Sequence, residues 1–135
     1  MSMPGMGVMI GMLGGNKKTV EAVRAALGKV IYKATLEDDT LMLAFEDGSR
    51  LAFTDEGQSC CERRWMHTDA DLPYYTGAKL LDVSLEAAAP PPPDDADAYE
   101  AQFLHIHTDK GILDAVTHVD HNGYYGGFWV VARPA

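Results

Sequence analysis

Two short, mainly apolar stretches in the first half of the chain are separated by turn residues, which is the pattern of two β-strands joined in a hairpin. The stretches cover residues 41–45 and 50–53, on either side of Glu46-Asp47-Gly48-Ser49. A one-residue change of register moves every side chain to the opposite face of a strand, so the loop length decides which residues share a face. A three-residue loop, Asp47-Gly48-Ser49, gathers the large apolar side chains on one face and is therefore predicted. Those side chains are Leu41, Leu43, Phe45, Leu51 and Phe53.

A second pair of alternating stretches, residues 99–108 and 111–118, predicts another hairpin around Asp109-Lys110. One face of this hairpin is apolar and is expected to belong to the core; it comprises Leu104, Ile106, Leu113 and Ala115. The other face carries Phe103, His105, His107, Asp114, Val116 and His118. Polar residues are expected on the solvent side of an antiparallel sheet, so this face does not by itself establish a site.

Two segments carry signals for helices. Asn16 can cap a helix that runs to about Leu27, and Gly28 follows where a helix end favours positive φ. The sequence Ser59-x-x-Glu62 matches a capping box, which predicts a short helix that begins at Cys60 and covers residues 59–65.

Two further strands are expected at residues 79–86 and 128–132, and residues 69–75 are expected to form a turn. The count is then one or two helices with six or seven mainly antiparallel strands, which defines an α+β domain. The predicted organisation is a flexible leader at 1–15 and a single α+β domain at 16–135, with a Pro-rich surface loop at 87–97.

The 135-residue chain has a net charge of -9, which repels the phosphates of a nucleic-acid duplex and the headgroups of an anionic membrane. Neither partner is expected, whereas a small anion can bind where arginines are concentrated. The only cysteines, Cys60 and Cys61, are neighbours in the sequence, and a disulfide between neighbours would close a strained ring. Reduced thiols and a cytoplasmic location are therefore expected.

Two stretches, residues 55–65 and 117–128, contain more functional side chains than a simple connection requires. Adjacent arginines in the first can hold phosphate, while its tryptophan and the paired tyrosines of the second offer flat faces to a base. The prediction is a non-enzymatic protein that binds a small anionic ligand. The predicted ligand-binding residues are Arg63, Arg64, Trp65, His118, His121, Asn122, Tyr124 and Tyr125.

A second interpretation is a hydrolase or transferase that depends on a cysteine or a metal. Cys60 and Cys61 at a helix start would favour the thiolate, with His118 or His121 as the general base. The histidines at positions 105, 107, 118 and 121 could supply imidazoles to a metal, but no zinc-binding spacing is present. Neither a metal nor another cofactor is predicted.

A third interpretation is an acidic inhibitor that docks on a basic host enzyme, in keeping with the net charge of -9. Such mimicry requires carboxylates arrayed along one surface. Asp94, Asp95 and Asp97 lie in the Pro-rich loop, and the other carboxylates are scattered through turns.

The chain is also rich in residues that are typical of protein interfaces. Trp65, Tyr74, Tyr75, Trp129 and a methionine-rich leader offer more aromatic and apolar surface than a small domain readily hides. A homo-oligomer is therefore expected, most simply a two-fold dimer.

Two blocks carry a family resemblance: residues 55–71, with the motif G-Q-S-C-C-E-x-R, and residues 103–128, with T-D-K-G and H-N-G-Y-Y-G-G-F. They resemble a family of small domains of unknown function from bacteriophages and from bacteria, notably actinobacteria, over about residues 27–132. The chain has Val119 and Asp120 where that family is expected to have Asn and Glu.

A bacteriophage setting implies a role in host takeover or immune evasion, in the host cytoplasm. One class of such proteins comprises sponges that sequester cyclic nucleotide or ADP-ribose-like immune signals, usually as oligomers. The resemblance thus implies a nucleotide signal as the small anionic ligand.

Overall fold

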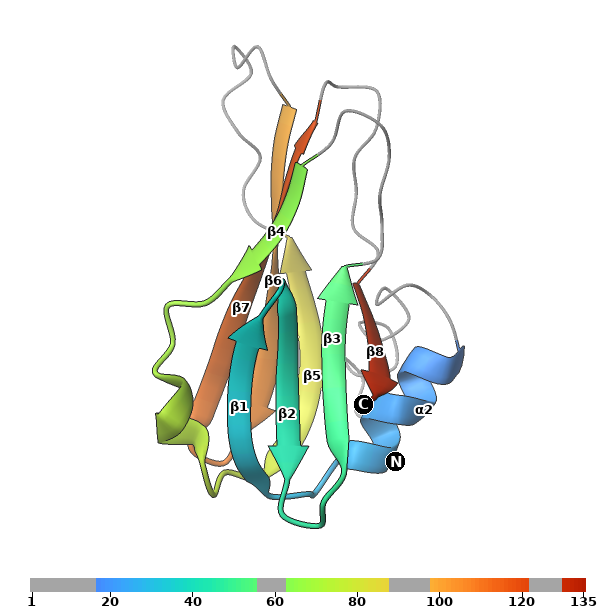
Figure 1. Cartoon of the computed structure of the whole chain (residues 1–135), viewed down its shortest axis with the longest axis vertical. Coiled ribbons are helices and arrows are strands. Elements are labelled where there is room, and N and C mark those ends of the chain that lie inside the picture. The colour runs from blue at the N-terminus through green and yellow to red at the C-terminus, as the bar shows by residue number, and fades with distance from the viewer. Residues whose placement is uncertain (1–16, 56–62, 88–97, 122–129) are drawn as a thin grey trace.

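Two four-stranded antiparallel sheets face each other in the computed structural model (Figure 1), which describes residues 17–55, 63–87, 98–121 and 130–135. The first sheet has the order β1-β2-β3-β8 and the second has the order β4-β7-β6-β5. The strands of the first sheet are β1 (Ile31–Glu37), β2 (Thr40–Phe45), β3 (Arg50–Asp55) and β8 (Val130–Pro134). Those of the second are β4 (Arg63–His67), β5 (Leu80–Ala87), β6 (Ala98–Thr108) and β7 (Gly111–His121).

The core fills the space between the two sheets, and alternation along the strands selects its members. Both sheets contribute side chains to one buried cluster. The first sheet contributes Ile31, Leu41, Leu43, Phe45, Leu51 and Phe53, and the second contributes Leu80, Val83, Leu85, Leu104, Ile106, Leu113 and Ala115. The predicted α+β class and the predicted core faces of both hairpins are confirmed.

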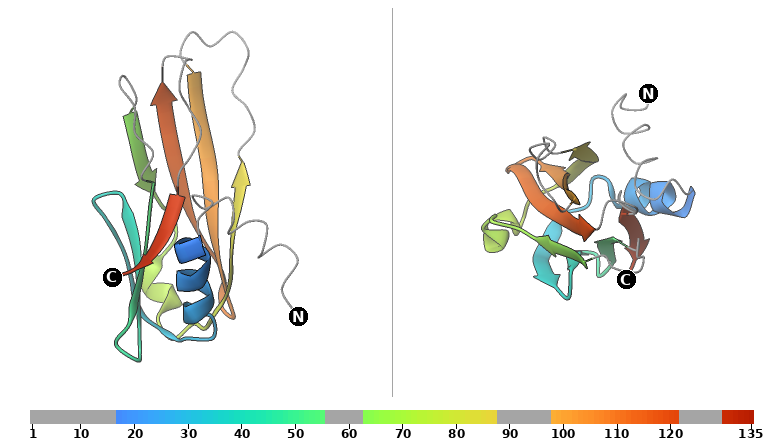
Figure 2. Two further views of the ribbon diagram at one scale, coloured as in Figure 1. Left: turned by 90° about the vertical axis from the view of Figure 1, so that its right-hand side faces the viewer. Right: turned by 90° about the horizontal axis from the view of Figure 1, so that it is seen from above.

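One helix, α2 (Lys17–Ala26), closes the side of the core beside β8 (Figure 2). Val23 is fully buried, while the ends of the helix are marked by exposed lysines and by Gly28. Gly28 has φ +86 and donates its amide to Leu80 O at 2.8 Å, which ties the helix end to the second sheet. The expected helix at residues 16–27 is thus confirmed with nearly the same bounds.

The first hairpin has a three-residue loop, as predicted, but the loop is Glu46-Asp47-Gly48 rather than Asp47-Gly48-Ser49. The amide of Phe45 donates to Ser49 O at 2.8 Å, so these two residues face each other across the loop. Gly48 takes the last loop position with φ +91, where an L side chain would be strained. The shift moves the register by two residues, which leaves every side chain on its predicted face.

The second hairpin has the predicted turn, since Thr108 pairs with Gly111 around Asp109-Lys110. Its strand β7 continues three residues beyond the predicted end and reaches His121. The last strand begins at Val130, and the first two residues of the strand that was expected at 128–132 lie outside the described residues.

The helix predicted over residues 59–65 is wrong for its last part, because Arg63–His67 forms strand β4. Met66 is buried and its neighbours Trp65 and His67 are partly exposed, which is the alternation of a strand rather than of a helix. Pairing with β7 overrides the local capping signal, since every residue from Arg63 to His67 has a partner on β7. Cys60 to Glu62 lie outside the described residues.

The sequence also underestimates the number of strands, which is eight in the described part of the chain. The strand that the periodicity fails to delimit is β1, which is joined to β2 by Asp38-Asp39. Both turn residues have positive φ, 50 and 57, as a two-residue hairpin turn requires. The predicted leader and most of the Pro-rich loop lie outside the described residues.

The segment between β4 and β5 contains the short 3-10 helix η1 (Leu72–Tyr75) at the expected turn. Tyr75 is buried and donates its hydroxyl to Ile112 O at 2.9 Å. It therefore completes the core of its own chain and is not part of an aromatic surface, in contrast to the expectation. Within the described residues, no helix is long and apolar enough to cross a membrane.

Two leucines of β5 give a matched test of the two-sheet core. Leu85 is 1% exposed and Leu81 is 44% exposed. Replacement of Leu85 by Ala is expected to lower the free energy of unfolding by about 2 to 5 kcal/mol, because it leaves a cavity between the sheets. The control Leu81→Ala is expected to cost less than about 1 kcal/mol. Urea denaturation followed by circular dichroism measures both values, and equal losses would contradict this arrangement of the core.

Candidate functional site

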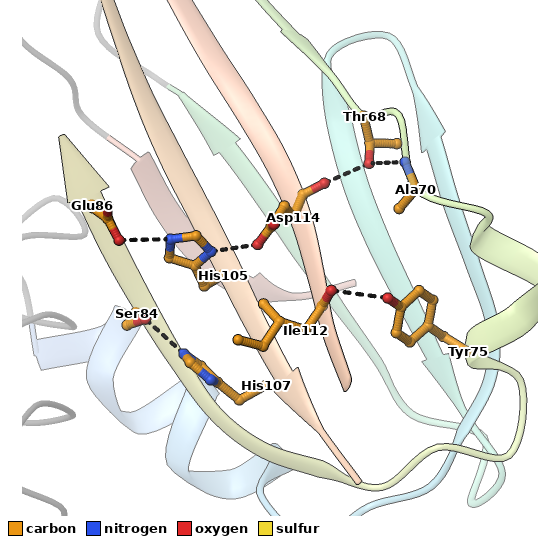
Figure 3. A network of polar contacts seen from close by, with 9 residues as sticks. All are labelled: Thr68, Ala70, Tyr75, Ser84, Glu86, His105, His107, Ile112 and Asp114. Atoms are coloured by element: carbon orange, nitrogen blue, oxygen red, sulfur yellow. Dashed lines mark hydrogen bonds and ion pairs between the residues drawn. The ribbon is translucent and has the colours of Figure 1, made fainter. Parts of the chain in front are cut away.

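The outer face of the second sheet, which points away from the core, carries a row of polar side chains from three strands. Ser84 and Glu86 come from β5, His105 and His107 from β6, and Asp114 from β7 (Figure 3). These positions alternate with the buried Leu85, Leu104, Ile106, Leu113 and Ala115. Strand alternation therefore places the histidines on this face, as predicted.

His105 is the centre of this row. Its Nε2 lies 3.3 Å from Glu86 Oε2, and its Nδ1 contacts Asp114 Oδ1. Behind Asp114, the hydroxyl of Thr68 donates to the Asp114 carbonyl oxygen and accepts the amide of Ala70 at 3.0 Å. The row thus connects β5, β6 and β7 to the segment that follows β4.

His107 forms a second contact on this face, with its Nε2 2.8 Å from Ser84 Oγ. A serine beside an imidazole resembles half of a nucleophilic site, but here both residues lie on regular strands next to the His105 row. The contact therefore links β5 to β6. A hollow of about 350 Å³ adjoins the row between Tyr75 and Phe103, and Asp114 is among its lining residues.

A separate cluster lies on β4 and β7, where Trp65 is directly opposite His118. The Trp65 and His118 rings are stacked, with centroids 4.7 Å apart and an interplanar angle of 12°. His118 Nε2 lies 2.7 Å from His67 Nδ1. Trp65, His67 and His118, called here the β4–β7 cluster, thus form one connected group.

The electrostatics of the β4–β7 cluster disfavour positive charge on His118. Burial lowers the pKa of His118, and the proximity of His67 lowers it further. The imidazole of His118 is therefore largely neutral at pH 7, and can serve as an acceptor or as a metal ligand. On the other side of the cluster, His67 Nε2 lies 3.9 Å from Asp69 Oδ2.

The strand register brings the two predicted halves of the site together. Arg63 is paired with Asp120, Arg64 with Val119 and Trp65 with His118. His121 ends β7 at the part of the second sheet that extends beyond the first sheet (Figure 1). Other predicted site residues, namely Asn122, Tyr124 and Tyr125, lie outside the described residues, as do Cys60 and Cys61.

Comparison with known sequences places the chain in a family. Residues 24–131 match the sequence profile of a domain of unknown function, DUF7448. The chain belongs to this family. The match extends from α2 into β8, so the DUF7448 domain includes the second sheet, the His105 row and the β4–β7 cluster. No curated protein and no solved structure matches the chain.

His67 is a residue of the β4–β7 cluster that sequence reasoning missed. The expectation of a helix over residues 59–65 hid the alternation of Trp65, Met66 and His67, which places the first and third on one face of a strand. Among the residues that the structure describes, no group of three histidine, cysteine, aspartate or glutamate side chains could hold a metal ion.

The lowered pKa of His118 predicts a dependence of stability on pH. Between that lowered value and the ordinary value of 6.5, the unfolded chain binds a proton that the folded chain does not. The free energy of unfolding is therefore expected to fall as the pH decreases below about 6.5. Replacement of His118 by Gln should remove this part of the slope, while the control His107→Gln should keep it.

Urea denaturation at a series of pH values between about 5 and 7.5 measures the slope. Asp47 does not interfere, because its hydrogen bond from the Ser49 hydroxyl, followed by that from the Ser49 amide, lowers its pKa from 3.8 to about 2. An unchanged slope in the His118→Gln variant would contradict the assignment.

Proposed function

We propose that the protein binds a small anionic ligand that carries a flat group, such as a nucleotide, and does not transform it. The observation that carries this proposal is the pairing of Trp65 with His118, which places a stacked indole and imidazole beside the end of β7. Aromatic side chains on a sheet are suitable platforms for a base. The chain leaves β7 there and enters the segment of Asn122, Tyr124 and Tyr125.

In this proposal the arginines supply local positive charge in a chain whose net charge is -9. Arg63 and Arg64 precede Trp65 directly on β4, and their backbone is paired with Asp120 and Val119 of β7. They are assigned to the phosphate, since charge-assisted hydrogen bonds to an anion are strong. Tyr124 and Tyr125 are assigned to stacking, Asn122 to the polar edges of the base, and His118 and His121 to the rim of the site.

The described histidines favour binding over catalysis. His105 is engaged by Glu86 and Asp114, His107 by Ser84, and His67 and His118 by each other. A general base needs access to the proton that it removes, and each of these rings has at least one nitrogen in a contact with another side chain. The cysteine-dependent alternative rests on Cys60 and Cys61, outside the described residues, and no observation favours it.

The biological role proposed for this binding is sequestration of a nucleotide immune signal by a bacteriophage protein. The membership in DUF7448 is compatible with this role but does not specify it. A sponge needs only tight binding and a high protein concentration, and no catalytic group is required of the site.

The binding proposal predicts thermal stabilisation by a nucleotide. A screen of mono-, di- and cyclic nucleotides is expected to identify at least one compound that raises the melting temperature, since a ligand of the folded state stabilises it by mass action. Replacement of Arg63 by Ala, two positions before Trp65 on β4, should weaken binding at least about tenfold. The exposed Arg24 on α2 provides the control, because Arg24→Ala removes the same charge far from β4. Absence of stabilisation by every nucleotide would contradict the nucleotide version.

We also propose a homo-oligomer, most simply a two-fold dimer. Tyr74 and Ile112 are 55% and 50% exposed, and Tyr32 is 64% exposed. Edge strands such as β1 and β4 offer backbone groups to a second copy. Light scattering at micromolar concentration is expected to give about twice the chain mass of 14.7 kDa. A mass near 14.7 kDa would refute the dimer.

A further inference from the structure

The rings of His67 and His118 meet through their edges and not through their faces. Their planes differ by 14°, and their centroids are 4.7 Å apart. Rings stacked through their faces keep their atoms at van der Waals separation, about 3.5 Å. The 2.7 Å between His67 Nδ1 and His118 Nε2 is much shorter. The two rings are therefore not stacked face to face at this contact, and one nitrogen of each lies at hydrogen-bond distance from the other.

This arrangement is close to the geometry in which two imidazoles bind one metal ion, because the ion lies in the plane of each ring along the nitrogen lone pair. Nitrogen–zinc distances of 2.0 to 2.1 Å in a tetrahedral site place the two nitrogens roughly 3.3 Å apart. The observed pair at 2.7 Å would need to open by only about 0.6 Å.

The surroundings of His67 also fit this use. Its second nitrogen, Nε2, lies 3.9 Å from Asp69 Oδ2. Histidines that bind metals commonly donate the N–H of their other nitrogen to a carboxylate, which fixes the tautomer. The side chain of His67 is 41% exposed, so an ion can reach it from solvent. Trp65, stacked on His118, restricts the other ring of the pair.

We propose that His67 and His118 bind a divalent cation of borderline softness, Zn²⁺, Ni²⁺ or Cu²⁺, through His67 Nδ1 and His118 Nε2. The hydrogen that lies between the two nitrogens moves to the other nitrogen of its own ring, so both imidazoles stay neutral. If that ring is His67, the hydrogen arrives at Nε2 and faces the Asp69 carboxylate. Imidazole ligands suit these three metals.

The site is open. Because no third ligand is found among the described residues, water or an added anion fills the remaining positions around the metal. The inference is independent of the proposed nucleotide binding, since the metal alone is the probe. Loss of one does not entail loss of the other.

The test uses tag-free protein in which Cys60 and Cys61 are both replaced by Ser, so that adjacent thiols do not bind the metal. Titration calorimetry with ZnCl₂ or NiCl₂ is expected to show one saturable site. At a metal concentration ten times the dissociation constant, the melting temperature should rise by roughly 4 °C. His67→Gln and His118→Gln should each weaken binding at least about tenfold, since each removes one of two protein ligands.

Two histidines of the same sheet face provide matched controls. His105→Gln and His107→Gln should leave the affinity unchanged, because these two histidines do not belong to the β4–β7 cluster. His105 contacts Asp114 of β7, and His107 contacts Ser84 of β5. A loss of binding in these variants, with binding kept in His67→Gln, would overturn the assignment. Absence of saturable binding at millimolar metal would also overturn it.

One measurement does not depend on histidine variants that fold. Substoichiometric Cu²⁺ added to the cysteine-free protein should broaden the imidazole NMR signals of His67 and His118 first. The spin-resonance spectrum should show coupling to two imidazole nitrogens. Broadening centred on His105 or His107, or coupling to no more than one nitrogen, would refute the proposal.

Discussion

The register between β6 and β7 is the constraint on which the rest of the second sheet depends. Eleven consecutive pairs, from Ala98 opposite His121 to Thr108 opposite Gly111, join these strands without a bulge. A shift by one residue would exchange the faces, so that Leu113 and Ala115 would meet solvent and Asp114 would enter the core. The apolar face therefore holds the register, and the register in turn fixes every pair on the outer face.

The outer face uses this register to join strands through side chains. Because His105 lies opposite Asp114 on β7 and opposite Ser84 on β5, its ring reaches carboxylates on both sides. The same strand β7 carries His118, which faces Trp65 of β4. Strand β7 thus contributes to the core, to the His105 row and to the β4–β7 cluster. The polar side chains of the outer face therefore contact partners on neighbouring strands, at positions that the register sets.

Sequence reasoning succeeds here where the pattern has a period of two and a turn residue marks its end. Both predicted hairpins, with Gly48 and Gly111 at their turns, belong to this kind. Reasoning fails at β4, because a capping box describes only four neighbouring residues, whereas this strand exists through pairing with residues about fifty positions away. The predicted site shares this limit: Trp65 and His118 are recognisable as functional types, but their contact, and the part played by His67, follow only from the register.

Strand β4 lies at the edge of its sheet, and its position relies on contacts from several directions. Its backbone pairs with β7, and the amide of Met66 donates to Asp39 Oδ1 in the β1–β2 turn at 3.1 Å. The Met66 side chain is buried between the sheets. These contacts fix the strand through its backbone and its inward side chain, while the outward side chains, Trp65 and His67, remain partly exposed. A ligand or an ion that binds to them meets a rigid strand, and rigidity reduces the entropy lost on binding.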